Sequence, residues 1–281
     1  MINLFVQWLA MGLAIGCRPV YGLYLFLIFP LFASEIKERL FFSRKGLVNT
    51  LCVMLPMALI GAGLLYFNKL RFGSLFDFGN NYNLSQTDLE YSGMGVRKLW
   101  LGIFEYLFQP MSIKGSFPYV ESIYGFENSS IDYQGYVFFD PVYAGYFALC
   151  PISLAIVFLK RCKKTLADMK MYYYCILSLI FVCILLFVDI EKGGITQRYQ
   201  MDFGMLIDFG VVLILIALFK MSEGSAYKNA FKVLLFAVIV FGGLSMFNNF
   251  IIMLAEDKQN ALIYVNPRMF YSIKYLLFAL R

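Results

Sequence analysis

The residue of this chain that most clearly invites a chemical question is Asp208, one carboxylate inside a long apolar segment. It lies in Gly204-Met-Leu-Ile-Asp-Phe-Gly-Val-Val-Leu-Ile-Leu-Ile-Ala-Leu-Phe219, whereas the other charged side chains lie between the apolar runs. A carboxylate at bilayer depth costs about 2.5 to 3.5 kcal/mol on insertion scales, so it is usually neutral, paired or exposed to a polar cavity. Asp208 is therefore either a functional site or a group satisfied by a polar partner from another helix.

Three further clusters place arginine beside glycine or aspartate at the edge of an apolar run. They are Gly12-Leu-Ala-Ile-Gly-Cys-Arg-Pro19, Tyr66-Phe-Asn-Lys-Leu-Arg-Phe-Gly-Ser-Leu-Phe-Asp-Phe-Gly79 and Gly193-Gly-Ile-Thr-Gln-Arg-Tyr-Gln-Met-Asp-Phe-Gly204. The planar guanidinium groups of Arg18, Arg71 and Arg198 suit phosphate oxygens. Plainer readings stay open, because Arg18 also fits an interfacial arginine whose charge reaches water, and Arg71 with Asp77 also fits a structural ion pair.

The third cluster leads into the segment that carries Asp208. If a helix begins near Gln197, Arg198 and Asp202 are i, i+4 neighbours and can pair. Asp208 then lies about 9 Å further along the helix and about 120° around it from Asp202. The two carboxylates therefore do not form a dyad on one face.

The composition predicts an all-α bundle of membrane-spanning helices. Hydrophobic residues make up 60% of the 281 residues and charged residues 15%, far from the roughly 45 to 50% and 25% of soluble domains. Runs long enough to cross a bilayer are Gly46–Asn68, Val142–Leu159, Met171–Val188, Phe203–Phe219 and Ala230–Leu254. Pro19 divides the first 34 residues into a hairpin of two short helices, Ile2–Cys17 and Val20–Ser34, which gives about seven spans.

The basic residues predict the orientation. Three short connections, 35–45, 160–170 and 220–232, hold half of the 24 Lys and Arg residues, and short cytoplasmic loops are enriched in both. We therefore expect a multi-pass protein of the cell membrane with a cytoplasmic N-terminus, and the net charge of +6 needs no nucleic-acid partner. The absence of His and of clustered Cys argues against a zinc site or a His-based triad, and no cofactor is expected.

Outside the spans, residues 69–141 form a long extracytoplasmic loop rich in aromatic side chains. Within it, Gly95–Gln109 has Val96, Leu99, Trp100, Ile103 and Leu107 on one helical face, with Arg97, Lys98, Glu105 and Gln109 opposite. This spacing predicts a helix in the outer membrane interface. The loop either covers the bundle or forms a lid for a sugar or lipid. Residues 266–280 predict an amphipathic tail helix with Asn266 as N-cap and Pro267 at its first position.

At the three arginine clusters, the chain resembles the C-terminal half of bacterial GT-C type glycosyltransferases of the cell envelope, related to the protein mannosyltransferases and lipid A aminoarabinose transferases. The resemblance rests on the Gly-Leu-Ala-x-Gly-x-x-Arg-Pro helix end, the Arg-Phe-Gly-Ser-x-Phe-Asp-Phe-Gly segment and the Gln-Arg-Tyr-x-x-Asp-Phe entry. Such enzymes take a sugar from a polyprenyl-phosphate carrier at the outer face. They use an acidic residue of the first outer loop and cations that hold the phosphate.

The resemblance implies a substrate-binding set in this chain. Its members are Arg18, Arg71 and Arg198 with Tyr199 at the carrier phosphate, and Asp77, Asp202 and Asp208, which orient sugar hydroxyls or those cations. The loop with the catalytic acid would precede Met1, so no catalytic residue is assigned, and we expect an upstream N-terminal half of the same protein as a partner beside the membrane lipids. Leu75 and Gly204 stand where the family pattern predicts Pro.

Two other functional classes fit the residues. One is a transporter or lipid flippase that uses Asp208 as an intramembrane proton or ion site. The other is a non-catalytic membrane scaffold. No internal repeat supports the transporter reading.

Overall fold

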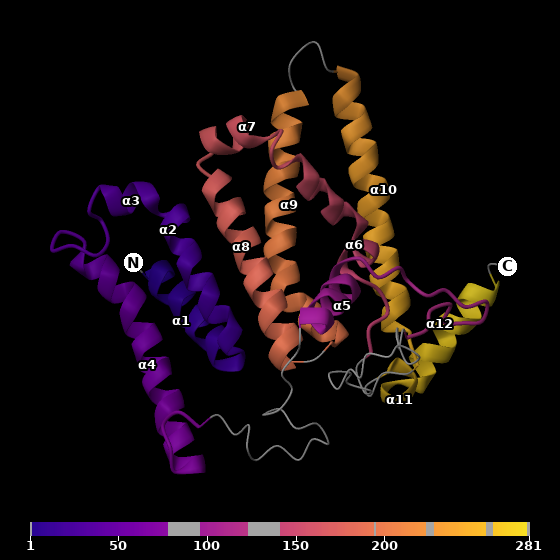
Figure 1. The fold of residues 1–281 in the computed structure, drawn as a ribbon, viewed down its shortest axis with the longest axis horizontal. Helices are drawn as coiled ribbons and strands as arrows, with labels where there is room; N and C mark the ends of the chain where they lie inside the picture. Colours follow the sequence, from indigo (N-terminus) through magenta and orange to yellow (C-terminus); the bar gives the residue numbers. More distant parts are fainter. Residues whose placement is uncertain are drawn as a thin grey trace. The chain divides into compact units, whose positions relative to one another are not determined.

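The structure is a computed structural model that describes residues 2–77, 96–122, 141–193, 195–222, 228–256 and 261–279. Every named element in these ranges is a helix, and an isolated bridge joins Ile113 to Val120 (Figure 1). The chain divides into two compact units, Met1–Glu90 and Tyr91–Arg281, which are described separately.

The first unit consists of helices broken by a proline and by a polar turn. Its elements are α1 (Ile2–Cys17), the 3-10 helix η1 (Pro19–Leu27), α2 (Ile28–Leu31), α3 (Ala33–Lys37) and α4 (Leu47–Phe72). The expected second arm of the hairpin, Val20–Ser34, is therefore not one α-helix. Pro19 starts η1 directly after Arg18, which has extended backbone angles, because proline disfavours helix at the residue before it.

Two glycines let α1 approach α4 closely. A Cβ added at Gly12 would lie 2.7 Å from Ile60 Cδ1, and one at Gly16 would lie 3.2 Å from Leu64 Cδ1. Small residues four apart are typical of helix interfaces in membranes. Because Gly12 faces Ile60 and Gly16 faces Leu64, the two helices run parallel and their C-terminal ends lie at the same end of the unit.

The second unit is built around three long helices. Its elements are α5 (Val96–Leu107), α6 (Tyr146–Leu149), η3 (Pro151–Phe158), α7 (Lys163–Asp168), α8 (Tyr172–Val188), η4 (Asp189–Gly193), η5 (Gln197–Tyr199), α9 (Gln200–Ser222), α10 (Lys228–Met253), α11 (Leu262–Val265) and α12 (Pro267–Ala279). Helix α9 packs against α8 and α10, and η3 packs against α9 and α10. Within this unit, α7 lies at one end of the three helices and α5, α11 and α12 lie at the other (Figure 1).

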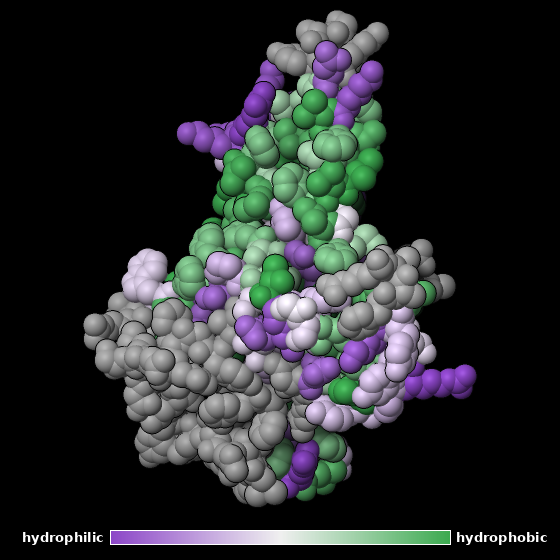
Figure 2. All heavy atoms as spheres, turned by 90° about the vertical axis from the view of Figure 1, so that its right-hand side faces the viewer, coloured by the Kyte–Doolittle hydropathy of each residue, from purple (hydrophilic) through white to green (hydrophobic). Residues whose placement is uncertain are grey.

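Four helices in the described ranges are long and apolar enough to cross a membrane, and the chain is consistent with an integral membrane protein. They cover Leu47–Phe72, Tyr172–Glu191, Gln197–Ser222 and Asn229–Met253. Each corresponds to a predicted span, but the count of seven is not confirmed. Figure 2 shows an apolar surface with hydrophilic side chains at its upper end, as expected for a segment between two polar boundaries.

The predicted span Val142–Leu159 is not a continuous helix, because Pro151 interrupts it. It forms α6 and η3, with Cys150 between them. Proline removes a donor and leaves the backbone groups around it without helical partners. Polar side chains of α10 bind two of those groups: Asn248 Nδ2 donates to the Ala148 carbonyl at 2.9 Å, and the Ile152 N–H donates to Ser245 Oγ at 3.4 Å. Neighbouring polar residues make such breaks tolerable in a membrane.

The expected outer loop, 69–141, is described only in part, since residues 78–95 and 123–140 lie outside the described residues. Its predicted helix is present as α5, and Glu105, which the spacing places on the face opposite the apolar residues, is buried. Glu105 is 2% exposed and Tyr106 is fully buried, whereas Trp100 is 68% exposed. A Cβ on Gly102, one turn before Glu105, would lie 2.8 Å from Ile190 Cγ2, so this polar face packs on η4. A position in the membrane interface stays a prediction.

The tail forms α12 from Pro267 onward, and its predicted cap is present. The Met269 N–H donates to Asn266 Oδ1 at 3.1 Å, which satisfies one of the helix's first donors. Phe270 of α12 is fully buried and packs against Phe117 with ring centroids 5.3 Å apart. The tail is therefore anchored to residues that precede α6.

Candidate functional site

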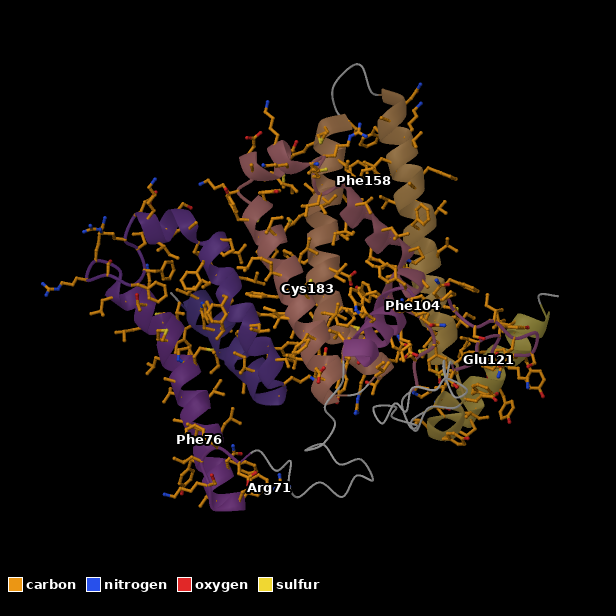
Figure 3. The ribbon with its side chains drawn as sticks, in the orientation of Figure 1. Arg71, Phe76, Phe104, Glu121, Phe158 and Cys183 are labelled. Carbon is orange, nitrogen blue, oxygen red and sulfur yellow. The ribbon has the colours of Figure 1, made fainter. Side chains whose placement is uncertain are left out.

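Three of the predicted substrate-binding residues lie in the first unit, near the C-terminal ends of its parallel helices. Arg18 follows α1 directly and is half-buried. Arg71 is exposed in the last turn of α4, with its guanidinium carbon 5.0 Å from the centre of the Phe72 ring. Gly73 ends α4 with a left-handed φ of 74°, a conformation that favours glycine, and the chain then passes Phe76 to reach Asp77 (Figure 3). Leu75 and the half-buried Asp77 lie in the turn after that cap.

The other four predicted residues lie in the second unit, where η5 leads into α9. Arg198 is exposed, and its guanidinium carbon lies 5.2 Å from the centre of the Tyr199 ring. Arginine stacked on an aromatic face keeps its donors directed outward along the plane of the guanidinium. Asp202 is fully buried, two residues into α9. The pairing of Arg198 with Asp202 stays a prediction.

Two glutamines fix the backbone beneath Arg198. Gln197 Oε1 accepts a hydrogen bond from the Tyr143 N–H at 2.9 Å, and Gln197 Nε2 donates to Gln200 Oε1. Gln200 is 1% exposed and donates to the Ala144 carbonyl at 2.8 Å and the Tyr106 carbonyl at 3.4 Å. These bonds tie η5 to α5 and to the segment before α6. We call the residues that these bonds join, Tyr106, Tyr143, Gln197 and Gln200, together with the nearby buried Asp202, the entry network.

Tyr106 is the centre of the entry network. It is fully buried, and its hydroxyl accepts a hydrogen bond from the Thr196 N–H at 3.3 Å. Its ring meets Phe203 edge-on, with centroids 5.6 Å apart. One aromatic side chain of α5 therefore contacts both the residue before η5 and the first turn of α9, which sets the angle at which the chain enters α9.

Gly204 has a specific partner in this structure. Its carbonyl accepts a hydrogen bond from the Tyr146 hydroxyl at 3.0 Å, and an added Cβ would lie 2.5 Å from Tyr146 Cε2. The Tyr146 ring also lies 5.8 Å from Phe203. The absence of a side chain at position 204, where the family pattern predicts Pro, makes room for Tyr146.

The buried carboxylates are not the one that the sequence singles out. Glu105, Asp189 and Asp202 are 2%, 5% and 0% exposed, whereas Asp208 belongs to the exposed residues. The prediction that Asp202 and Asp208 occupy different faces of one helix is confirmed. Asp208 lies on a face of α9 that is exposed at the protein surface, and its predicted position at bilayer depth stays a prediction.

Asp208 nevertheless has a polar neighbour from another element. The Tyr146 hydroxyl of α6 lies near its carboxylate. The one hydrogen of this hydroxyl is donated to the Gly204 carbonyl at 3.0 Å, so Tyr146 is a neighbour of both Gly204 and Asp208. That a polar partner from another helix satisfies Asp208 stays a prediction.

Several polar residues of the site carry no obvious signal in the sequence. The spacing around Glu105 is that of the polar face of an amphipathic helix and does not show that it is buried. Gln200 is uncharged and lies between Arg198 and Asp202, and nothing in its spacing marks it as a buried hydrogen-bond donor. Asn248 and Asn249 are a clearer case, because adjacent amides inside the apolar run of α10 predict a polar contact at depth. The structure identifies that contact as the break between α6 and η3.

Comparison with known proteins gives no further guide to this site. No family model matches the chain, and searches of the curated proteins and of the solved structures find no match. The assignment of function therefore depends on the residues of the entry network and on the surfaces around it.

Proposed function

We propose that this chain binds a polyprenyl-phosphate-linked sugar through the η5–α9 segment, as the carrier-binding part of a GT-C type glycosyltransferase. One observation supports this most strongly. Arg198 is exposed on a backbone that the half-buried Gln197 and the buried Gln200 hold in place. A cation at the start of a membrane-crossing helix suits the phosphate of a lipid whose chain lies in the bilayer.

The fixed backbone explains how such binding is specific. Ordering a long side chain on binding costs about 0.5 to 1.5 kcal/mol, and stacking Arg198 on Tyr199 reduces that cost in advance. A guanidinium offers two parallel donors to two phosphate oxygens. In the proposal, Tyr199 and Asp202 orient Arg198, and sugar hydroxyls lie toward the α5 side.

The aromatic surface of α5 fits the same ligand class. Trp100, Phe104 and Phe108 recur at intervals of four residues and are 68%, 41% and 56% exposed. Aromatic side chains are enriched where a membrane meets water, and they stack on the apolar faces of ligands. In the proposal, this stripe of α5 lies at the interface near the carrier's first isoprene units and the acceptor.

The proposed orientation has the entry network at the extracytoplasmic side, the N-terminus in the cytoplasm and about seven crossings. The basic residues of the second unit support it, because Lys160, Arg161, Lys163, Lys164 and Lys220 lie at the α7 end, opposite the entry network. The proposal assigns binding to these residues and leaves the catalytic acid to the upstream half that the resemblance implies.

The test is sugar transfer in membranes that contain the full gene product, with polyprenyl-phosphate sugars as donors. Arg198→Ala removes the charged donors and should lower transfer at subsaturating donor about tenfold or more, since hydrogen bonds to charged groups contribute about 1.5 to 3 kcal/mol. Arg268→Ala, at an exposed arginine of α12, is the matched control and should leave transfer unchanged.

Equal transfer by wild type and Arg198→Ala would refute the assigned role of Arg198. Solute uptake that is lost in Asp208→Asn, in a protein with no sugar transfer, would favour the transporter class instead. Asp208 has a polar neighbour in Tyr146, as an intramembrane site would need, so the uptake experiment should accompany the transfer assay.

A further inference from the structure

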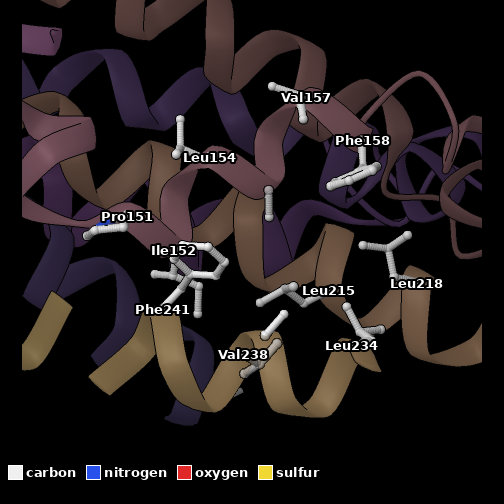
Figure 4. Close-up of a pocket in the computed structure, with 12 residues that line it drawn as sticks. Pro151, Ile152, Leu154, Val157, Phe158, Leu215, Leu218, Leu234, Val238 and Phe241 are labelled. Carbon is white, nitrogen blue, oxygen red and sulfur yellow. The ribbon is translucent and has the colours of Figure 1, made fainter. Parts of the chain in front are cut away.

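A groove with purely apolar walls runs between η3, α9 and α10, at some distance from the entry network. Its volume is about 220 Å³, and residues of all three elements line it, among them Ile152, Phe158, Leu215, Leu234 and Val238 (Figure 4). The 3-10 helix η3 is the reason for the hollow, since it is thinner than an α-helix and fills less of the space between its neighbours.

The groove continues into a second hollow that leads to the basic end of the unit. This hollow, of about 450 Å³, shares Phe158, Leu218 and Leu234 with the first and adds Arg161 and Ser222. Arg161 is exposed, as are the neighbouring Lys160 and Lys164. The polar side chains that line the two hollows therefore lie at the end where the positive charges gather.

The length of the groove matches one leaflet of a bilayer. Along α10 the two hollows extend from Ala230 to Phe241, which at 1.5 Å per residue is about 16 Å. Half of a hydrocarbon core of about 30 Å is about 15 Å. A ligand that fills the groove with its phosphate at Arg161 thus has an apolar part about as long as an acyl chain of a membrane lipid.

We propose that one acyl chain of an anionic phospholipid occupies this groove and that Arg161 binds the headgroup phosphate. The apolar walls disfavour a polar solute, and the exposed Arg161 at the mouth favours a ligand with a negative charge there. The positive-inside rule puts the basic end at the cytoplasmic leaflet, where the ligand is a bulk phospholipid. This site is separate from the entry network and does not depend on the function proposed for it.

The experiment is native mass spectrometry of the purified full chain in detergent, titrated with dioleoyl phosphatidylglycerol, dioleoyl phosphatidylcholine or polyprenyl phosphate. The two phospholipids have the same acyl chains, so they separate the groove from the headgroup contact. We expect phosphatidylglycerol to bind more tightly than phosphatidylcholine, and we expect the binding of polyprenyl phosphate not to depend on Ala237 of the groove. Arg161→Gln should weaken phosphatidylglycerol about tenfold, as expected for the loss of hydrogen bonds to a charged group, and weaken phosphatidylcholine less, because its choline cation already compensates the phosphate charge.

Two matched controls keep the result interpretable. Lys164→Gln removes a nearby exposed charge that lines neither hollow, and it should bind like wild type. Ala237→Phe fills the groove and should weaken both phospholipids, whereas Leu235→Phe enlarges a neighbouring exposed residue of α10 outside the groove and should weaken neither.

Three results would overturn the proposal. One is equal binding of phosphatidylglycerol and phosphatidylcholine by the wild type. Another is an equal effect of Arg161→Gln and Lys164→Gln. The third is tighter binding of polyprenyl phosphate than of phosphatidylglycerol that Ala237→Phe abolishes, which would assign the groove to the carrier.

Discussion

The close approach of Tyr146 to Gly204 predicts a measurable cost for a single methyl group. Gly204→Ala places a Cβ 2.5 Å from Cε2 and 3.1 Å from Cζ of a ring that is 3% exposed. Overpacking of this kind costs about 1 to 3 kcal/mol, and displacing the ring also weakens the 3.0 Å bond to the Gly204 carbonyl, worth about 0.5 to 1.5 kcal/mol. Alanine recovers about 1 kcal/mol of helix propensity. The net expected loss is about 2 kcal/mol.

The assay is thermal unfolding in detergent, followed with a fluorogenic maleimide that reacts with the buried thiols Cys162 and Cys175 as they become accessible. A loss of about 2 kcal/mol lowers Tm by about 4 to 8 °C in a protein of this size. Gly210→Ala, on the same helix, is the control, because nothing lies within 4 Å of its added Cβ. It should raise Tm. If Gly204→Ala were as stable as Gly210→Ala, the Tyr146 ring would not occupy the position described.

The remaining predictions concern the packing and reactivity around the site. Gln200→Leu leaves the Ala144 and Tyr106 carbonyls without this donor and should cost about 1 to 3 kcal/mol in the same assay, so an unchanged Tm would contradict the entry network. Gly145→Ala brings a Cβ within 2.5 Å of the Gln109 backbone nitrogen, where no side chain can yield, and should destabilise by about 3 kcal/mol, whereas Gly115→Ala meets nothing within 4 Å and should have no such effect. Burial shields the Cys162 thiol and raises its pKa, so at pH 8 it should react with maleimide more slowly than exposed Cys17 and stay slower as pH rises; equal rates at pH 8 would show that Cys162 is accessible.

The long helices can be predicted from the sequence because the length and apolar content of a segment are enough to identify a membrane-spanning helix. The segments 47–72, 172–191, 197–222 and 229–253 contain no proline except Pro56, and nothing local competes with a spanning helix. In the segment 142–159, Pro151 is the residue that argues against a continuous helix. What the sequence alone does not show is that Ser245 and Asn248, almost a hundred residues later, bind the backbone groups that this proline leaves unpaired.

The unpredicted features of the site have a common physical cause. A helical face inferred from the sequence does not show which neighbouring element packs on it. Glu105 is buried because its face of α5 packs on η4, while Trp100 on the same helix is exposed. Asp208 has apolar neighbours on all sides of α9, so the sequence does not show whether it lies on a buried or an exposed face of the helix. The packing of α8 and α10 on α9 determines which faces are buried.

The outward position of the entry network is the claim on which the proposed function depends most directly. It can be measured with a membrane-impermeant maleimide on intact cells, using Arg198→Cys and Lys164→Cys separately in a background whose native cysteines are replaced. If the entry network faces outward, position 198 is labelled in intact cells and position 164 is labelled only after permeabilisation. Labelling of position 164 but not 198 in intact cells would place Arg198 in the cytoplasm and contradict the account.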